Sequence, residues 1–209
     1  MDPNTHITEA RFTFLDIETT GLSYVKGEDI IELACVRTEG LKIASSWSEL
    51  IDAKRDGQRV RIKDDAAKVH GIHEIDLAGK PEFKAIAPKL VAELRQSDFV
   101  VIHNAPFDAG FIVPKMKSLA QPIPATPTIC SLKLARNLIE GDGGRSLDAL
   151  RFRYVEDQEG QAHRALNDTL ALYSVFFKLI YEFLGEDATL AEVLKRHGPT
   201  TPFLNFTPR

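Results

Sequence analysis

The first fifty residues show the spacing of apolar positions that β-strands require. Three runs alternate or cluster in this way, at residues 11–17, 29–38 and 41–51, and Glu39-Gly40 predicts a turn between the last two. The charged segment that follows, residues 52–63, predicts a loop. The N-terminal part of the chain therefore predicts three strands in succession.

Helical periodicity begins after this loop. Residues 64–70 predict a short helix, with Gly71 at the position of a left-handed C-terminal cap. Residues 83–95 place their apolar side chains on one stripe with a period of 3.6 residues, which predicts an amphipathic helix. The continuous apolar run at 99–102 is typical of a strand buried on both faces. Pro106 is suited to the first turn of the helix expected after it.

The remainder of the chain predicts helices joined by loops. A proline-containing loop is marked by Pro122, Pro124 and Pro127. Short helices fit residues 131–138 and 146–153, the second with Ser146 as its N-cap. The amphipathic stretch 164–183 predicts a long core helix, and after Gly185 we expect one short helix and a tail. The order of elements predicts a single α/β domain with a mixed sheet.

The composition sets the domain organisation and the compartment that we expect. Of the 209 residues, 44% are apolar and 27% are charged, which is typical of a soluble folded protein. We expect a polar N-terminal segment at 1–11, one domain at 12–184 and a tail at 185–209. No apolar run approaches the roughly 18 residues of a membrane span. The polar N-terminus lacks a signal-peptide core, so we expect a cytoplasmic protein without membrane contact.

Cysteine usage agrees with that compartment. Cys35 and Cys130 lie in apolar stretches without CxxC spacing, so we expect both to be buried, reduced thiols.

The net charge of −4 argues mildly against a nucleic-acid partner, since such proteins usually carry a basic surface. A site built of carboxylates would lower the net charge, and bound cations would reverse its local sign. Basic residues gather in one part of the chain, namely Lys133, Arg136, Arg145, Arg151, Arg153 and Arg164. Solvated surface charge explains this group as well as a functional basic patch does.

Asp16 and Glu18 are the first candidates for chemistry. Side chains two residues apart on a strand face the same side, so the two carboxylates project together. Like charges this close need a cation between them, and hard oxygen ligands suit Mg²⁺ or Mn²⁺. Taken alone, however, Asp-x-Glu is better explained as two solvated carboxylates on an exposed strand face.

Two later segments supply further candidates. Asp108 falls in the first turn expected after the buried strand, where the helix dipole also favours a carboxylate. His163 is expected to precede the long helix and Asp168 to lie in its second turn, so that both side chains face one cleft. Each of these features is weak evidence by itself.

The three segments together, in this order, resemble the exonuclease superfamily that has four metal-binding acids and a histidine. The segments are Asp16-Ile17-Glu18-Thr19-Thr20-Gly21-Leu22, Ile102-His103-Asn104-Ala105-Pro106-Phe107-Asp108 and His163-Arg164-Ala165-Leu166-Asn167-Asp168. Within that superfamily the chain is most similar to the epsilon-type proofreading exonucleases of bacterial replicative DNA polymerase, over about residues 12–184. Val69-His70-Gly71-Ile72 and Ser146-Leu147-Asp148-Ala149-Leu150 also resemble that family.

The resemblance implies a ribonuclease-H-like fold, with a five-stranded mixed sheet flanked by helices. It implies two divalent ions, Mg²⁺ or Mn²⁺, with Asp16 bridging both, Glu18 and Asp168 completing the first, and Asp108 supporting the second. His163 would be the general base. Two such ions can clamp the attacking and the leaving oxygen of a phosphodiester. The implied reaction releases nucleoside 5′-monophosphates from a 3′ end.

The resemblance also implies the substrate and its contacts. We expect single-stranded or frayed 3′ ends of DNA, with RNA as an alternative, and association with a DNA polymerase subunit. The expected substrate contacts are Ile17, Thr19, Thr20, Gly21, Leu22, His103, Asn104 and Phe107. His70 and His73 invite a second metal site, but a helix C-terminus favours histidine in any case.

Three alternatives stay open at this point. An exoribonuclease of the same superfamily would carry the same motifs, because metals act on the phosphate and only a contact to the 2′-OH separates the sugars. A silent nucleic-acid-binding module would have kept the fold without turnover. A two-carboxylate glycosidase would work without divalent metal. The tail shows no recognisable polymerase-binding or clamp-binding sequence, which leaves open whether the chain is a replisome subunit or a freestanding relative.

Overall fold

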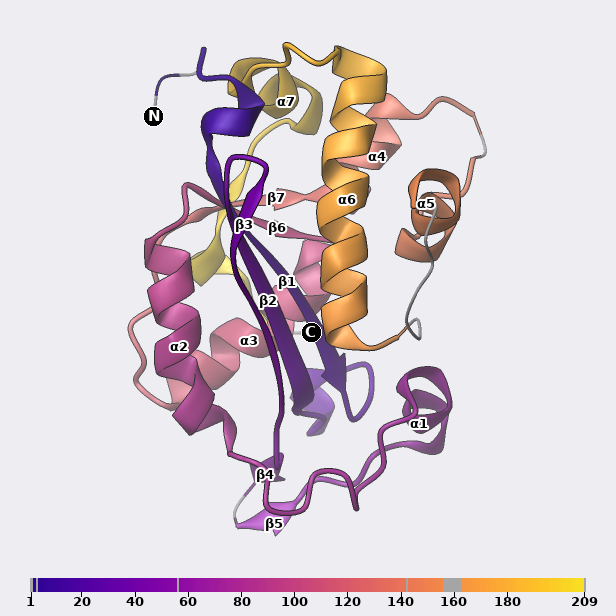
Figure 1. The fold of residues 1–209 in the computed structure, drawn as a ribbon. Helices are drawn as coiled ribbons and strands as arrows, with labels where there is room; N and C mark the ends of the chain where they lie inside the picture. Colours follow the sequence, from indigo (N-terminus) through magenta and orange to yellow (C-terminus); the bar gives the residue numbers. More distant parts are fainter. Residues whose placement is uncertain (1, 3, 56, 142, 156–162, 209) are drawn as a thin grey trace.

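A six-stranded mixed sheet with helices on both faces organises the chain (Figure 1). The computed structural model describes residues 2, 4–55, 57–141, 143–155 and 163–208. The strand order is β3-β2-β1-β6-β7-β8. Strands β1, β6 and β7 are parallel to one another, whereas β2, β3 and β8 are antiparallel to their neighbours.

The three N-terminal strands form where the apolar pattern predicts them. They are β1 (Arg11–Thr19), β2 (Ile30–Glu39) and β3 (Lys42–Leu50), paired as an antiparallel meander. The predicted buried strand is β6 (Phe99–Ile102), and all four of its residues are buried. The prediction of a mixed α/β sheet is therefore confirmed.

The expected number of five strands is corrected to six. Strand β7 (Pro127–Cys130) begins at the last proline of the predicted loop and continues through residues for which no element is predicted. Pro127 is compatible with the strand because it occupies the first position, where a missing N–H is tolerated. The sixth strand, β8 (Thr201–Pro202), is a two-residue edge strand in the tail. The loop expected at 52–63 contains a small separate hairpin of β4 (Lys54–Arg55) and β5 (Gln58–Arg59).

The predicted helices are present with bounds that shift by at most a residue or so. They are α1 (Asp64–His70), α2 (Phe83–Arg95), α3 (Ala105–Ser118), α4 (Ser131–Leu138), α5 (Leu147–Tyr154), α6 (Ala165–Leu184) and α7 (Leu190–His197). Gly71 is in the left-handed region with φ 68°, and its N–H donates to the Ala67 carbonyl. The Ser146 hydroxyl accepts from the Ala149 N–H, as expected of an N-cap.

Alternation along β1 divides the interior into two cores. Phe12 and Phe14 point toward α6 and pack against Phe176 with ring centroids 5.4 and 5.6 Å away. Leu15 and Ile17 point to the opposite face, into the core that contains the buried side chains of α2 and α3. In Figure 1, α6 crosses one face of the sheet while α2 and α3 cover the other. Strand β1 is thus fixed from both sides.

The segments expected to flank the domain pack against it. Ile7, from the short 3₁₀ helix η1 (Ile7–Glu9), is buried in the same core as Leu190 and Val193 of α7. The cysteines are free, as expected, but only Cys35 is fully buried, while Cys130 is partly exposed at the entry to α4. Among the helices that the structure describes, none combines the length and apolar character needed to cross a membrane.

A buried carboxylate joins α2 to the far side of the meander. Glu93 accepts hydrogen bonds from Arg37 Nε at 2.9 Å, from Trp47 Nε1 at 3.1 Å and from Ser45 Oγ at 2.6 Å. Arg37 also pairs with Glu39. Because Arg37 and Glu93 are both buried, removal of either leaves a charge without its partner in a poorly solvated place.

We expect Glu93→Ala to lower the free energy of unfolding by about 3–5 kcal/mol, since two buried donors and one partly buried donor lose their acceptor. Urea unfolding of the purified variant measures this. Glu49→Ala is the matched control, because Glu49 pairs with Lys89 at the surface, where an ion pair contributes only about 0–1 kcal/mol. Equal losses in the two variants would contradict the assignment.

Candidate active site

Strand β1 carries two carboxylates, which follow its buried phenylalanines along the same face. Asp16 and Glu18 continue the face that carries Phe12 and Phe14, so they project from the side of the sheet that α6 covers. In the antiparallel register Asp16 lies opposite Ala34, and Glu18 lies opposite Glu32. The spacing inferred from the sequence therefore does place both side chains on one face.

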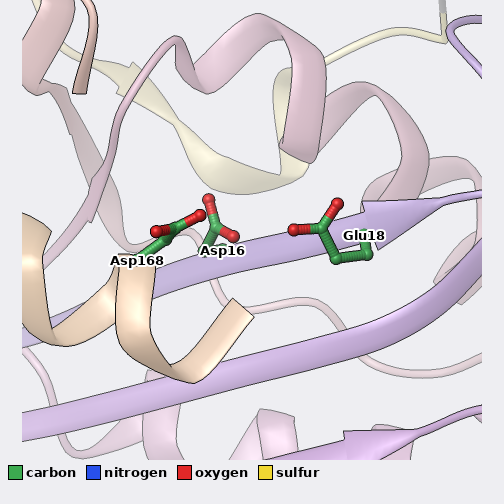
Figure 2. A group of neighbouring side chains, drawn as sticks. All are labelled: Asp16, Glu18 and Asp168. Carbon is green, nitrogen blue, oxygen red and sulfur yellow. The ribbon is translucent and has the colours of Figure 1, made fainter. Parts of the chain in front are cut away.

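Asp168 brings a third carboxylate from α6. Oxygen atoms of Asp16, Glu18 and Asp168 lie within 4.8 Å of one another, and Figure 2 shows the three carboxyl groups gathered over β1. Asp168 is in the first turn of α6 and not in the second, because the helix begins at Ala165. The side chain consequently projects from the helix end that lies nearest to β1.

Asp108 completes the acidic group from the other helical layer. It lies in the first turn of α3, is 3% exposed and accepts a hydrogen bond from the Ile17 backbone N–H. It lines the same cleft of about 200 Å³ as the other three acids. It is not part of the tight group of three, and its link to that group is electrostatic, through Asp16 and Glu18.

Burial and mutual repulsion make these carboxyls hard to ionise. Burial, followed by the charges of Asp108, Glu18 and Asp168, holds the pKa of Asp16 well above its ordinary value. Burial and neighbouring acids raise the pKa of Glu18 to about 9. Burial raises the pKa of Asp108 to about 8 and also raises that of Asp168. The site therefore favours protons or cations among its oxygens.

His163 stands at the mouth of the cleft, just before α6. Its backbone has φ 61°, and its N–H donates to Asp168 Oδ2 at 3.1 Å, which fixes this left-handed conformation. Its side chain is partly exposed and lines the cleft, with Nε2 3.8 Å from Asp148 Oδ2. The imidazole is thus beside the acids and open to solvent.

Sequence reasoning missed two residues that surround the acids. For Arg151 the sequence leaves a solvated surface charge and a functional basic patch equally open, but the side chain is 6% exposed, and its Nη1 lies 3.5 Å from Asp168 Oδ1. Asp148 was noticed only as part of a resembling segment, yet it lines the cleft beside His163. Both lie on α5, and nothing in the local pattern of that helix marks them.

Glu32 is a third missed residue, and it anchors the start of α6. Its carboxylate, 1% exposed, accepts from Arg164 Nε and Nη2 at 3.2 and 3.3 Å and from the Ala165 N–H at 3.3 Å. Ser48 Oγ donates to it as well, at 3.1 Å. Arg164 belongs to the basic group noted in the sequence, and in the structure it is bound by Glu32. This ion pair joins α6 to β2, immediately next to His163.

Six of the eight expected substrate contacts fall into two neighbouring spaces. Ile17, His103 and Phe107 line the acidic cleft. Burial lowers the pKa of His103 to about 4, so its ring is neutral at pH 7, and Nδ1 lies 2.9 Å from Ser131 Oγ. Phe107 packs against Phe111, with ring centroids 5.3 Å apart.

The second space is an apolar cavity of about 450 Å³ next to the cleft. Thr19, Gly21 and Leu22 line it together with Val69 and His70. Leu22 is 80% exposed and Val69 is 52% exposed there, so both offer apolar surface to an occupant of the cavity. Glu18 lines both spaces and so forms the boundary between them.

Two expected contacts lie elsewhere. Thr20 is fully buried, and its hydroxyl accepts from the Asp29 N–H, so it holds the turn after β1. Asn104 has φ 62° and lines a different cavity beyond α3. No acidic or cysteine partner joins His70 and His73 in a metal-type group within the described chain, and His70 instead accepts from the Ile72 N–H.

Comparison with known proteins agrees with this geometry. The exonuclease family model RNase_T matches residues 13–176. The DNA polymerase III subunit epsilon of Rickettsia prowazekii is 34% identical over 179 residues, covering 83% of this chain and 75% of the relative.

Solved structures agree as well. Exonuclease X in complex with 5′ overhanging duplex DNA has a TM-score of 0.66 and 26% identity, covering 90% of this chain and 99% of that one. The nuclease domain of 3′hExo, a DEDDh family member bound to rAMP, shares the fold, with a TM-score of 0.69, 14% identity and coverage of 87% and 96%. The chain belongs to the RNase_T exonuclease family, and it is a 3′-to-5′ exonuclease with the ribonuclease-H-like fold that its motifs predict.

Proposed function

We propose that this exonuclease removes nucleotides from single-stranded or frayed 3′ ends of DNA, in the manner of a proofreading enzyme that works with a DNA polymerase. The observation that carries the proposal is the group of three carboxylates within 4.8 Å beside His163, in a chain 34% identical to a polymerase III epsilon subunit. Exonuclease X, a structural relative, is described in complex with duplex DNA that has a 5′ overhang. This role belongs in the cytoplasm with the chromosome.

The acidic site fits divalent cations. Its donors are all hard carboxylate oxygens, and burial raises the pKa of each of the four acids, which a bound cation would counteract. In our proposal Asp16, Glu18 and Asp168 hold one Mg²⁺ or Mn²⁺, and Asp16 with Asp108 holds a second. Bound ions of this kind polarise the phosphodiester and make water a better nucleophile at neutral pH.

The chain's own residues then bind, orient and move protons. His163 accepts a proton on its imidazole from the attacking water, and its exposure lets that proton pass to solvent. Asp168 holds the His163 backbone, and Glu32 holds Arg164 beside it, so the base is fixed from both sides. Leu22 and Phe107 supply apolar surface for the terminal bases, where stacking is worth about 1–3 kcal/mol per base.

The metal proposal predicts how the stability of the chelated protein depends on pH. Glu18 and Asp108 have folded-state pKa values of about 9 and about 8, above roughly 4 in the unfolded chain, so the folded state retains protons that the unfolded state loses. The contribution of these two groups to the stability of the folded protein in EDTA is therefore greatest below about pH 4, and it falls as the pH rises toward 9. We expect the Tm to drop by about 5–10 °C between pH 6 and 9.

Saturating Mn²⁺ should remove most of this drop, because the cation takes the place of the protons. Glu18→Gln should flatten the EDTA curve while abolishing turnover. Asp65→Asn, at an exposed acid, is the control and should leave the slope intact. Calorimetry at matched ionic strength measures all three, and a pH-independent Tm of the chelated wild-type protein would count against the acid cluster.

The second prediction distinguishes two roles for His163, a general base and a metal ligand. We expect His163→Ala to lower kcat by roughly 10²–10⁴-fold, the usual contribution of general base catalysis, with Mn²⁺ affinity retained. Calorimetric titration of Mn²⁺ and single-turnover rates give the two readouts. His73→Ala, at an exposed histidine outside the cleft, is the control. A variant that loses Mn²⁺ affinity but turns over normally at saturating Mn²⁺ would make His163 a ligand.

The third prediction concerns the DNA end. Drawing a paired terminus into a cleft of about 200 Å³ requires base pairs to open, at about 1.4 kcal/mol per step, so two steps slow a duplex roughly 100-fold. A 5′-labelled primer should be digested fastest alone, more slowly with a 3′ mismatch and slowest when fully paired. A matched RNA primer tests the exoribonuclease alternative. Equal rates on the three DNA forms would refute the proofreading preference.

A further inference from the structure

A second cavity lies on the other side of the first turn of α3. His103 lines the acidic cleft, whereas the next three residues, Asn104, Ala105 and Pro106, line a cavity of about 340 Å³. Its opposite wall comes from α4, where Lys133 and Arg136 are one turn apart. We call this cavity the α4 groove. The two spaces are separated only by the short segment that joins β6 to α3.

The α4 groove carries uncompensated positive charge. Within the described chain no carboxylate lines it, and neither Lys133 nor Arg136 forms an ion pair. Three other cavities that contain basic residues differ, because acids pair with basic residues in each of them. Lys54 pairs with Asp52 and Lys115 with Asp29 in one, Arg61 with Asp64 in the second, and Lys63 with Glu28 in the third. Unpaired cations along a groove favour an anion as the occupant.

Hydrogen bonds within the protein hold the walls of the groove in place. His197 of α7 accepts from the Cys130 N–H at Nε2, 3.0 Å away, and Nδ1 lies 2.9 Å from the Gly198 carbonyl. Burial lowers the pKa of His197, which agrees with a neutral ring that donates from Nδ1. Lys133 Nζ donates to the Pro199 carbonyl at 3.1 Å, which keeps its ammonium group at the wall.

A polar atom on the groove wall also lacks a partner. Thr128 of β7 lines the groove, is 2% exposed, and its hydroxyl has no hydrogen-bond partner among the described residues. Buried hydroxyls are normally paired, so an unpaired one on a residue that lines the same groove as two cations without ion-pair partners suits a site for a ligand with acceptor oxygens.

The two sides of the acidic cleft differ in a way that assigns a direction to a bound strand. On the Glu18 side lies the apolar cavity with Leu22, which suits a nucleoside. On the His103 side lies the α4 groove, which suits a phosphate. A strand whose last phosphodiester occupies the cleft must continue out of it on one side. On the Glu18 side Lys26 and Lys63 are accompanied by the acids Glu18, Glu28 and Asp65, and Lys63 pairs with Glu28, whereas the His103 side offers two cations and no lining carboxylate in the described chain.

We propose that the α4 groove binds a backbone phosphate of the substrate strand, upstream of the phosphodiester that is cut. The proposal rests on the action on 3′ ends of DNA that is proposed above. Lys133 and Arg136 hold the strand by charge and do not touch the reacting phosphate. The groove therefore determines affinity for strands of several nucleotides, and a substrate with a single phosphodiester makes no use of it.

Two substrates distinguish an effect of the α4 groove from an effect of the acidic cleft. One is a ten-residue oligothymidylate, and the other is the p-nitrophenyl ester of thymidine 5′-monophosphate, which has no upstream phosphate. In Lys133→Gln/Arg136→Gln, we expect the ratio of kcat/KM for the oligonucleotide to that for the ester to fall about tenfold. The change should reside in KM, and the slope of log KM against log salt should decrease by about 1–2, as expected for two lost phosphate contacts.

The matched control is Arg95→Gln/Lys117→Gln, which removes the same charge from exposed residues at the ends of α2 and α3. If the control variant lowers the ratio equally, the net charge of the protein explains the effect and the groove proposal is contradicted. If the groove variant leaves the ratio unaltered, or lowers both activities together, the groove is again overturned.

Neutral methylphosphonates, placed one at a time along the oligonucleotide, locate the phosphate. One upstream position should weaken binding to the wild-type protein and have no effect on the groove variant. Anisotropy with a His163→Ala background measures this without turnover, so it remains informative if the nuclease proposal itself fails. If both proteins respond equally to the methylphosphonate at every position, the groove proposal is contradicted. If the protein does not digest DNA but one position still depends on the groove, only the proposed action on DNA ends is contradicted.

Discussion

Repulsion among buried carboxylates at the end of β1 is the constraint on which the rest of the structure depends. Asp16, Glu18 and Asp168 share a space in which their oxygens lie within 4.8 Å of one another, and burial raises the pKa of each. A strand that carries such a group would move away unless both of its faces were held. Phe12 and Phe14 on one face and Leu15 and Ile17 on the other bury it in two cores, so hydrophobic packing opposes the electrostatic cost.

The protein's own cations are placed near the acids without neutralising them. Arg151 lies 3.5 Å from one oxygen of Asp168, and Arg164 is engaged by Glu32, one residue beyond His163. Neither guanidinium is within ion-pair distance of Asp16 or Glu18 in the described structure. The positive charge that lowers the electrostatic cost of burying these acids is thus kept at the edge of the site. The centre is left with oxygens that a divalent ion can bind.

Periodicity predicted most of the fold, and spacing predicted part of the site. Local patterns are sufficient for β1 and for the long helix, because each buries a continuous apolar face. They fail for β7 and β8, which have four and two residues and are defined by pairing with distant strands. The pair Asp16 and Glu18 follows from alternation alone, whereas Asp108 and Asp168 needed the resemblance. Glu32 and Arg164 meet across 132 residues, a contact that no local pattern contains.

The same carboxylate that completes the acidic group also holds the histidine in position. Asp168 Oδ2 accepts from the His163 N–H, while Asp168 Oδ1 faces Arg151. Since His163 has φ 61°, a conformation that L-residues rarely adopt, this hydrogen bond and the Glu32–Arg164 pair are what keep it there. An ionised Asp168 is the better acceptor, and bound cations favour the ionised form. Cation binding and correct placement of the base are therefore linked through one side chain.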